Sequence, residues 1–504
     1  MSRLSTEAVL RTAAHARGEA PAVECNGEIE SYNSLLQQAR SVAGALRAAL
    51  GPTPAPIAYM SRNGLPLVRL LLGAMIAGVP LVPINWRLNE TEIRDLLEDA
   101  GATHIVCSNE FGAVAQACAE ALGIALVDLG DGLLVEGLPV SGTGGKRDDL
   151  HPGTAFILYT SGTSGRPKGV MVGEHAILYP ADVVRGRWLL DETSVHLVVS
   201  PLFHTAGLMN LIAGLISGAH NLLVEPRTEA MLRTIADRSV TNLMVVPAVL
   251  AEMVKAASRG ADLSSLKCVV FGSDRSSVEM IGEAQRLFGS VITQGYGLTE
   301  VAGAVVSSSP ELFAGRIDPE ERLATVGLPF DGVDVRIAGT TAPCEVGEVL
   351  IRTPSIASGY LGLPRETEAA FTPDGFFRTG DLGFFDEDGF LYVSGRLKDL
   401  IISGGENIFP AEVERVLVSH PAIADAAVVG VPDQRWGQRV KAFVTLGVDG
   451  EASEEELIAH ARRFLAKYKC PAEIEFMEEL PRNSLGKIVK SAFETSEGGS
   501  SDAR

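Results

Sequence analysis

The sequence has no excess of positive charge and no cysteine or histidine at metal-binding spacing. Its 504 residues include 43 Lys and Arg against 63 Asp and Glu, a formal charge of −20 at pH 7. Such a chain is not expected to bind nucleic acid, although backbone amides and a few cations can still hold a small anion such as phosphate. The six cysteines form no C-x-x-C pair, so we expect mostly buried, reduced thiols, as is usual in the cytoplasm.

Long uninterrupted hydrophobic runs are also missing. The first residues contain no apolar run before a small-residue cleavage site, so we expect no signal peptide. Leu70–Asn85 is too short to span a bilayer and contains two prolines, and Pro201–Val224 is interrupted by histidines, asparagines and glycines. We therefore expect both segments to lie in a protein core, and no integral membrane segment.

Apolar segments of strand length alternate with amphipathic helix patterns over most of the chain. This alternation predicts parallel sheets covered by helices, and the length suits two or three domains. The expected strands are Ala55–Tyr59, Val79–Ile84, His104–Cys107, His196–Val199, Asn242–Val246 and Lys267–Phe271, and the expected helices are Tyr32–Leu50, Glu90–Asp99 and Ala230–Arg238.

The pattern changes after about residue 325. Short strands punctuated by glycine turns predict an antiparallel or barrel-like lobe, and the last hundred residues predict a compact α+β unit. The expected strands are Asp334–Ile337, Gly347–Arg352, Gly389–Ser394, Ala426–Val431 and Lys441–Leu446, and the expected helices are Ala411–Ser419 and Glu454–Lys467.

The most informative segment is Tyr159–Val170, which reads YTSGTSGRPKGV and follows the apolar strand Ala155–Tyr159. Its glycines let the backbone approach phosphate oxygens, its hydroxyls are donors, and Lys168 supplies a positive charge. It is not a Walker loop, because Pro167 precedes the lysine and Gly169 follows it. A flexible connector is the alternative, but such linkers rarely follow a buried strand.

This segment resembles the signature loop of the adenylate-forming (ANL) superfamily, in its AMP-forming acyl- and aryl-CoA synthetase branch that includes benzoate-type CoA ligases. The resemblance implies that the loop holds the phosphates of ATP and that Thr163 is also catalytic and a ligand of Mg²⁺. The phosphate-binding residues implied are Thr160, Ser161, Gly162, Thr163, Ser164, Gly165 and Lys168.

Gly295–Glu300, which reads GYGLTE, is similar to the second signature of the superfamily. An aromatic ring can stack on adenine, a hydroxyl can reach a phosphate, and a carboxylate can hold Mg²⁺. A tyrosine-containing turn is the plain structural alternative. By resemblance, the nucleotide-binding residues are Gly295, Tyr296, Gly297 and Thr299, and the catalytic carboxylate and metal ligand is Glu300.

Phe377–Leu382 matches the ribose motif of the superfamily, in which Asp381 accepts hydrogen bonds from both ribose hydroxyls. The resemblance places Arg396 on the same nucleotide and makes Lys398 the hinge about which the small domain turns. It also makes Lys487, in Pro481–Lys487, the cation that steadies the reacting oxygens at the α-phosphorus.

Two features of the last hundred residues resemble the surface that receives coenzyme A. Gly404 and Gly405 would let the pantetheine arm pass close to the backbone. Trp436, in the polar stretch Asp433–Gln438, matches a tryptophan that packs on the CoA adenine in aryl-CoA ligases; a structural tryptophan at the edge of the domain is the alternative.

Two segments qualify the resemblance. The adenine loop reads Gly272-Ser273-Asp274-Arg275, with a charged pair where relatives have small residues and proline. Arg275 either meets a second carboxylate on the substrate or pairs with Asp274. His204 resembles the histidine that gates the acyl pocket, although a histidine on an apolar run is more often a core residue.

The expected fold is α/β, with a large N-terminal domain of two helix-covered sheets plus a β-barrel-like subdomain (residues 1–395), a hinge (396–398) and a small mobile α+β domain (399–504). The expected activity is an acid–thiol ligase that forms acyl-AMP from ATP, with Mg²⁺, and then acyl-CoA from coenzyme A. The acid is aromatic, similar to benzoate or cinnamate, or a medium-chain fatty acid. Small residues along the pocket are expected to leave room for it: Ala206, Gly207, Gly295, Ala302 and Gly303.

Three alternatives stay open: an enzyme that loads an acyl group onto a carrier protein, a kinase or ATPase, and a non-catalytic nucleotide-binding scaffold. The segment after Phe203 has no aspartate, which disfavours an amino-acid substrate, and the absent Walker pattern disfavours a kinase. The sequence does not indicate the oligomeric state, and a homodimer is left open.

Overall fold

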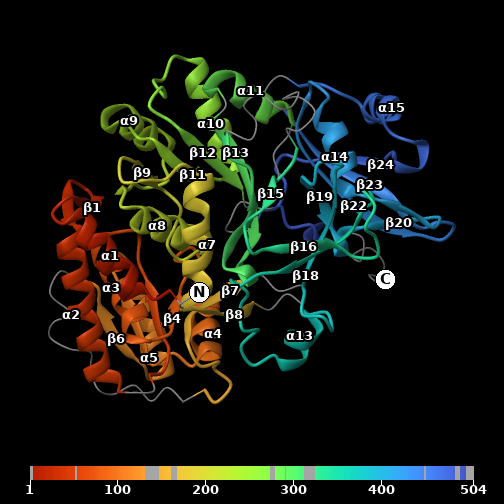
Figure 1. Ribbon diagram of the computed structural model, residues 1–504. Helices are drawn as coiled ribbons and strands as arrows, with labels where there is room; N and C mark the ends of the chain where they lie inside the picture. The colour runs from red at the N-terminus through yellow and green to blue at the C-terminus, as the bar shows by residue number, and fades with distance from the viewer. Residues whose placement is uncertain are drawn as a thin grey trace. The chain divides into compact units, whose positions relative to one another are not determined.

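The computed structural model describes residues 4–51, 54–130, 147–160, 167–272, 278–289, 291–310, 324–447, 450–482 and 488–494. The chain forms two compact units. Unit 1 comprises Met1–Val335 and Ile351–Phe377, and unit 2 comprises Arg336–Leu350 and Arg378–Arg504. Figure 1 shows the elements of each unit. Within the described ranges, no helix is both long and apolar enough to cross a membrane.

Unit 1 contains a six-stranded sheet in the order β6-β5-β3-β4-β7-β8. Its neighbours run parallel except β7 and β8, which form an antiparallel pair at one edge. Helices α4 and α5 cover one face through a core that includes Ile93, Cys118 and Ile157. The elements are β3 (Ile57–Met60), β4 (Leu81–Pro83), β5 (His104–Cys107), β6 (Ala125–Asp128), β7 (Thr154–Thr160), β8 (Lys168–Gly173), α3 (Leu65–Ala77), α4 (Glu90–Ala100) and α5 (Gly112–Leu122).

The second sheet of unit 1 has nine strands in the order β15-β14-β13-β12-β11-β9-β10-β1-β2. Its central strands run parallel, and β2, β14 and β15 pair antiparallel toward the edges. Helices α9, α10 and α11 cover one face. The strands are β1 (Pro21–Cys25), β2 (Glu28–Ser31), β9 (Val195–Val198), β10 (His220–Leu223), β11 (Asn242–Val245), β12 (Cys268–Gly272), β13 (Ile292–Leu298), β14 (Gly303–Ser307) and β15 (Leu328–Pro329), and the helices are α9 (Thr228–Arg238), α10 (Pro247–Ser258) and α11 (Val278–Phe288).

One large core joins the two sheets of unit 1. It contains side chains from both sheets and from α1 (Thr6–Arg17), α2 (Tyr32–Leu50), α3, α7 (Glu174–Arg187) and α8 (Thr205–Ser217). Helices α2 and α3 can approach closely because residue 73 is glycine: a Cβ there would lie 2.4 Å from Val42 Cγ1. The two apolar runs of the sequence contribute α3, β4 and α8 to this region, so the prediction that they are core segments is confirmed.

Unit 2 holds most of a four-stranded sheet and all of a five-stranded one. The first has the order β16-β17-β18-β19, an open path among the described strands, and the second has the order β21-β20-β23-β22 with β24 paired to β23. Helices α14 and α15 pack on the five-stranded sheet. The elements are β16 (Asp334–Ile337), β17 (Gly347–Arg352), β18 (Phe377–Phe385), β19 (Leu391–Arg396), β20 (Ile401–Ser403), β21 (Glu406–Ile408), α14 (Pro410–Val418), β22 (Ile423–Asp433), β23 (Gly437–Leu446), α15 (Glu454–Phe464), β24 (Glu473–Phe476) and α16 (Ser491–Glu494).

The predicted elements are present, and their ends follow local capping. The predicted helix Tyr32–Leu50 agrees with α2, which begins after Ser31, whose side chain accepts from Ser34 N, and ends at Gly51, with φ of 73°. The helix predicted over Glu454–Lys467 is too long, because Leu465 is extended and ends α15 at Phe464. The strands predicted as Ala426–Val431 and Lys441–Leu446 are longer in the structure, since polar residues at their ends also join the ladder.

Candidate active site

The predicted phosphate loop connects β7 to β8. In this antiparallel pair Thr160 lies opposite Lys168, and Tyr159 lies opposite Gly169. The strand ends therefore bring one hydroxyl and one ammonium group to the two sides of the loop. Residues 161–166 lie outside the described ranges, and they include the predicted Ser161, Gly162, Thr163, Ser164 and Gly165.

Tyr159 anchors the strand that ends at Thr160. Its hydroxyl donates to Asp99 Oδ2 at 2.6 Å, near the end of α4. Burial raises the pKa of Tyr159, and the hydrogen bond to Asp99 raises it further, so the phenol remains protonated and able to donate. Gly169 fits against this ring, because a Cβ at that position would lie 3.2 Å from Tyr159 Cζ.

Glu300 lies in a 3₁₀ turn, η2 (Thr299–Val301), that follows β13. Its Oε1 accepts a hydrogen bond from the hydroxyl of Tyr360 at 3.0 Å, and its backbone oxygen accepts from Ala357 N at 2.8 Å. The ring of Tyr360 also lies under the Lys168 ammonium, with Nζ 5.1 Å from the ring centroid. One tyrosine thus contacts both the predicted phosphate lysine and the predicted metal ligand.

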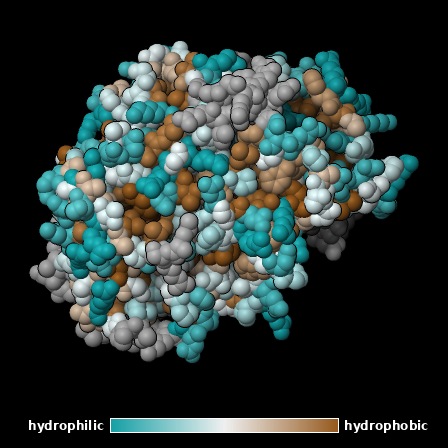
Figure 2. All heavy atoms as spheres, viewed as in Figure 1, coloured by the Kyte–Doolittle hydropathy of each residue, from teal (hydrophilic) through white to brown (hydrophobic). Residues whose placement is uncertain are grey.

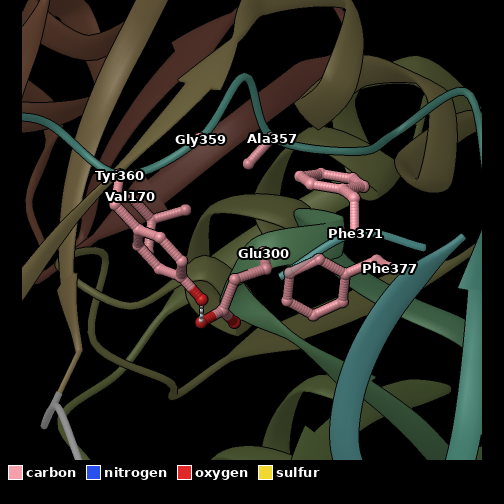
Figure 3. A pocket seen from close by; sticks show the side chains of 7 residues that line it. All are labelled: Val170, Glu300, Ala357, Gly359, Tyr360, Phe371 and Phe377. Atoms are coloured by element: carbon pink, nitrogen blue, oxygen red, sulfur yellow. Dashed lines mark hydrogen bonds between the residues drawn. The ribbon is translucent and has the colours of Figure 1, made fainter. Parts of the chain in front are cut away.

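The Tyr360 side chain borders a small hollow within unit 1, shown in Figure 3. In that view the Tyr360 hydroxyl points toward the Glu300 carboxylate, and two phenylalanine rings lie beside it. The rings of Phe371 and Phe377 meet edge to face at 5.5 Å. The hollow has a free volume of about 10 Å³, which is near the space that one water needs. The lining residues are Val170, Glu300, Ala357, Gly359, Tyr360, Phe371 and Phe377.

A carboxylate in this position suits Mg²⁺, which is usually held by one or two protein carboxylates together with substrate phosphates. Among the described residues no group of three or more His, Cys, Asp or Glu could hold a metal. Glu300 is half-buried and hydrogen-bonded on one oxygen, which fixes the orientation of the carboxyl group. Its chemistry therefore fits the predicted metal ion.

Gly272, the first residue of the predicted adenine loop, and the GYGLTE segment lie on adjacent parallel strands. Gly272 at the end of β12 is paired with Gly295 of β13, and a Cβ on Gly272 would lie 2.5 Å from Gly295 O. Gly297 also has no room for a side chain, because a Cβ there would lie 1.8 Å from Gly303 O. Tyr296 is half-buried on β13. The carboxyl ends of neighbouring parallel strands are a common place for ligands.

The acyl-pocket expectation needs a correction. Gly207 and Gly303 do not leave open space, because neighbouring atoms already occupy the place of a side chain. Gly295 differs, since a Cβ there would make only ordinary contacts, the nearest at 3.5 Å. A Cβ on Gly207 would lie 2.2 Å from Pro201 O, and a Cβ on Gly303 would lie 2.6 Å from Met209 Sδ. These residues are small so that α8, β14 and the loop before α8 can pack together.

His204 is the residue before α8, and Leu208 N donates to its backbone oxygen. Its ring lies 4.4 Å from that of Phe203, which contacts Trp86 edge to face at 6.1 Å. The loop is held by Tyr59, whose hydroxyl donates to Leu202 O at 2.6 Å. The histidine is therefore half-buried on a fixed loop with aromatic neighbours.

In unit 2 the predicted ribose motif contributes one residue to an ion pair. Asp381 and Arg396 lie opposite each other in β18 and β19, and Arg396 Nε is 2.9 Å from Asp381 Oδ1. Thr379 braces the turn: its Oγ1 accepts from Asp381 N and donates to Val349 O. Glu348 holds the same turn through Gly380 N. The structure therefore places Arg396 directly against the predicted ribose carboxylate.

The two features of the predicted CoA surface are neighbours in unit 2. Gly404 N donates to Trp436 O at 2.8 Å, and a Cβ on Gly404 would lie 2.8 Å from Trp436 Cε3. The indole is 49% exposed, and the Arg435 guanidinium lies 4.6 Å from its ring centroid. Asp433 orders this loop by accepting from the backbone N–H groups of Trp436 and Arg435, which lower the pKa of its carboxyl.

Two protein-family models match the chain, one over much of unit 1 and the other within unit 2. Residues 10–361 match the model of the AMP-binding enzyme family, and residues 412–487 match that of the AMP-binding enzyme C-terminal domain. The chain belongs to the AMP-binding enzyme family. The predicted superfamily is thereby confirmed.

Relatives of this AMP-binding enzyme match it over nearly its whole length. It is 33% identical to the fatty acid–[acyl-carrier-protein] ligase ScoC of Streptomyces coeruleorubidus, over 96% of this chain and 95% of that protein. It is 34% identical to a feruloyl-CoA synthase of Amycolatopsis, over 94% of each protein. Its structure is similar to o-succinylbenzoate CoA synthetase of Bacillus subtilis bound to the acyl-adenylate OSB-AMP, with a TM-score of 0.84, 30% identity and 98% of both chains covered. The same synthetase is known with ATP and a magnesium ion.

Several residues predicted for this AMP-binding enzyme have no described position. Ser273 and Asp274 lie outside the described ranges, as does Lys487. The chain on either side of the lysine is described: Arg482 and Ile488 form an antiparallel bridge, and Val489 N donates to Pro481 O. Lys398 lies exposed in a 3₁₀ turn, η3 (Leu397–Asp399), inside unit 2.

Sequence reasoning did not find Tyr360, Asp99 or Glu348. Each forms a hydrogen bond with a predicted site residue or with a direct neighbour of one, and the partners are 30 to 60 positions apart in the chain. No spacing in the sequence signals such contacts. The roles of all the predicted site residues, and the domain bounds at 395 and 399, remain predictions for this AMP-binding enzyme.

Proposed function

We propose that this protein is an ATP-dependent carboxylate–CoA ligase that forms an acyl-adenylate and then an acyl-CoA. The observation that carries the proposal is the arrangement in unit 1. There the lysine at the end of the phosphate loop and the GYGLTE carboxylate meet on one tyrosine, Tyr360. The family match and the names of the relatives support the same activity.

In the first step, an oxygen of the substrate carboxylate attacks the α-phosphorus of ATP. A new O–P bond forms, the bond from the α-phosphorus to the β-bridging oxygen breaks, and pyrophosphate leaves with the electron pair. Thr160 and Lys168 bind the phosphates, and Lys487 offsets the charge that builds up where two anions meet. Magnesium, when bound with ATP at Glu300, neutralises part of the phosphate charge.

In the second step, the thiol of coenzyme A attacks the acyl carbon. A C–S bond forms, the C–O bond to AMP breaks, and AMP leaves while the thiol proton goes to solvent. The exposed Trp436 ring is available for stacking on a base. The adjacent Gly404 has no side chain, so a ligand can approach the backbone beside the ring. We place the CoA-binding surface there.

For the acid we propose an aromatic compound similar to benzoate or cinnamate, or a medium-chain fatty acid. The names of the feruloyl-CoA synthase and of the o-succinylbenzoate CoA synthetase support the aromatic class. We further place the protein in the cytoplasm and leave the homodimer as a prediction.

A second acceptor is supported by one relative. ScoC is named as a ligase that uses an acyl-carrier protein, and the identity extends over nearly all of both chains. An acyl-adenylate formed in unit 1 would be chemically suited to either thiol, since both acceptors end in the same phosphopantetheine arm. The two candidate functions therefore differ only in the thiol that receives the acyl group.

The test is a panel of aromatic and aliphatic acids incubated with the protein, ATP and Mg²⁺, with either coenzyme A or a phosphopantetheinylated carrier protein. We expect acid-dependent release of AMP and pyrophosphate, and an acyl-CoA product. Production of ADP would indicate a kinase or ATPase, and failure to consume ATP with any acid would favour the non-catalytic scaffold. Acylation of the carrier protein without formation of acyl-CoA would identify the protein as a ligase that uses an acyl-carrier protein.

A further inference from the structure

Tyr360 contacts two predicted ATP-binding residues at the same time, although they are 132 positions apart in the chain (300 − 168). We propose that Tyr360 is a positioning residue that holds Glu300 and Lys168 in one fixed arrangement for magnesium-bound ATP. This inference rests on the proposed function and extends it to a residue outside the predicted signature segments.

The Tyr360 hydroxyl orients the carboxylate. It donates to Glu300 Oε1 at 3.0 Å, and both side chains are half-buried. A hydrogen bond on one oxygen limits rotation of the carboxyl group, as outer partners of metal-binding carboxylates commonly do.

The Tyr360 ring orients the lysine. Lys168 Nζ lies 5.1 Å from the ring centroid, within the range of a cation–π contact. Lysine has a long, flexible side chain, so an aromatic face beneath it restricts where its charge lies. Lys168 is the first residue of β8 and pairs with Thr160, the last residue of β7, so the ring restrains the ammonium beside this strand pair.

The backbone around Tyr360 is itself held in place. Tyr360 bridges to Val170 of β8, and its N–H donates to Thr367 Oγ1 at 2.9 Å. The preceding Gly359 has φ of 131°, and a Cβ there would lie 2.5 Å from Thr367 Cγ2. Because its backbone is held in place, the Tyr360 side chain can restrict the positions of Glu300 and Lys168.

The side chain also closes an apolar wall beside the carboxylate. Phe371, Phe377 and Val170 line the hollow next to Glu300 (Figure 3). Water is a strong competitor for a carboxylate and for a metal ion, and an apolar wall limits its approach from that side. The tyrosine hydroxyl is thus a polar partner of Glu300 on a side where apolar side chains predominate.

The experiment compares Tyr360→Phe, which removes only the hydroxyl, with Tyr360→Leu, which also removes the ring. Tyr32→Phe is the matched control, because it removes a buried hydroxyl that donates to a backbone carbonyl, Ala219 O, rather than to a site residue. Binding is measured by electron paramagnetic resonance with Mn²⁺ and a methylene analogue of ATP that cannot react. The Mg²⁺ dependence of pyrophosphate exchange is measured in parallel.

We expect Tyr360→Phe to weaken Mn²⁺ binding in the presence of the analogue by roughly 10- to 100-fold. We expect Tyr360→Leu to weaken analogue binding further, and Tyr32→Phe to change neither. In a Glu300→Gln background, the Tyr360→Phe effect should disappear, since the hydroxyl then has no metal ligand to orient.

Unchanged metal binding in Tyr360→Phe would overturn the inference, as would an equal loss in Tyr32→Phe. A loss that persists unchanged with Glu300→Gln would also overturn it, by assigning the effect to general packing. These outcomes are separate from failure of the proposed function, which would show as absence of acid-dependent pyrophosphate exchange in the unaltered protein.

Discussion

Asp381 shows how the fold of unit 2 restricts the orientation of a side chain that is predicted to bind the nucleotide. Asp381 is only 6% exposed, yet it remains ion-paired to Arg396 and braced by Thr379. The ion pair with Arg396 orients the carboxylate, and the Thr379 hydroxyl holds the backbone that carries it. Such a group can accept hydrogen bonds from a ribose without first reorganising.

The predicted contact between Asp381 and the ribose gives the first testable prediction. Asp381→Asn should raise the KM for ATP by roughly 10- to 100-fold, because hydrogen bonds to a charged acceptor contribute about 1.5–3 kcal/mol. Steady-state kinetics at saturating acid would measure this. Asp386→Asn, a substitution elsewhere in unit 2, is the control; an equal effect there would remove the special role of Asp381.

The second prediction concerns stability and pH. Glu24 is buried, and the hydrogen-bonded pair with Arg238 lowers the pKa of its carboxyl against the effect of burial. A carboxylate with a lowered folded pKa stabilises the fold above its unfolded pKa, and this stabilisation is lost as the pH falls through the folded pKa. Glu24→Gln should therefore cost about 1–3 kcal/mol at pH 7, less than breaking a fully buried pair, and progressively less below about pH 4.

Denaturant unfolding of unit 1 at several pH values checks this. The control is Glu7→Gln, because the Glu7–Arg40 pair has both side chains nearly half exposed and should contribute under about 1 kcal/mol. A Glu24→Gln penalty that grows as the pH falls would contradict the sign of the prediction.

At the scale of elements, the sequence predicted those whose pattern is local. The His104–Cys107 strand and the Tyr32–Leu50 helix have the predicted bounds, because their apolar periodicity and end signals lie within the element. Strand β13 was not predicted: it runs through Gly295 and Gly297, whose flexibility disguises a strand. Only its pairing with β12 and β14 makes it one.

The candidate site was predicted only as far as its motifs. The sequence predicted a strand followed by the phosphate loop, and the pairing of β7 with β8 places Thr160 opposite Lys168 at the two ends of that loop. Tyr360 was missed because its partners lie far away in the chain. The glycines at 207 and 303 were misread as open space, because a sequence does not show which neighbour occupies the place of a side chain.

The contact between Gly404 and Trp436, on the predicted CoA surface, gives the third prediction. Trp436→Ala should raise the KM for coenzyme A by about tenfold or more, since stacking on a base contributes roughly 1–3 kcal/mol. Pyrophosphate exchange should be unchanged, because it precedes the thiol step. Phe464→Ala is the control: Phe464 is also in unit 2 and is 65% exposed. Equal effects of the two substitutions would argue for a structural tryptophan.

At the scale of the whole molecule, the proposed mechanism has two chemical steps, and the chain has two units. The family models match a long first part and a shorter second part, and these parts overlap largely with units 1 and 2. If rotation about Lys398 exchanges the catalytic lysine for the CoA surface, the two steps should respond differently to a change in the hinge.

That requirement is the fourth prediction. Lys398→Pro fixes the backbone φ angle at the predicted hinge and removes an N–H. Acyl-CoA formation should fall by more than about tenfold while acid-dependent pyrophosphate exchange is retained. Lys398→Ala is the matched control, because it removes the charge without restricting the backbone. Equal losses in both steps would place Lys398 outside the hinge.

The central claim is that the acid is activated on ATP before any thiol takes part, with Lys487 acting at the α-phosphorus. The most direct measurement is the exchange of labelled pyrophosphate into ATP, with the acid present and coenzyme A omitted. We predict exchange that depends on the acid and collapses in Lys487→Ala. Exchange that proceeds without acid, or that persists undiminished in the variant, would contradict the account.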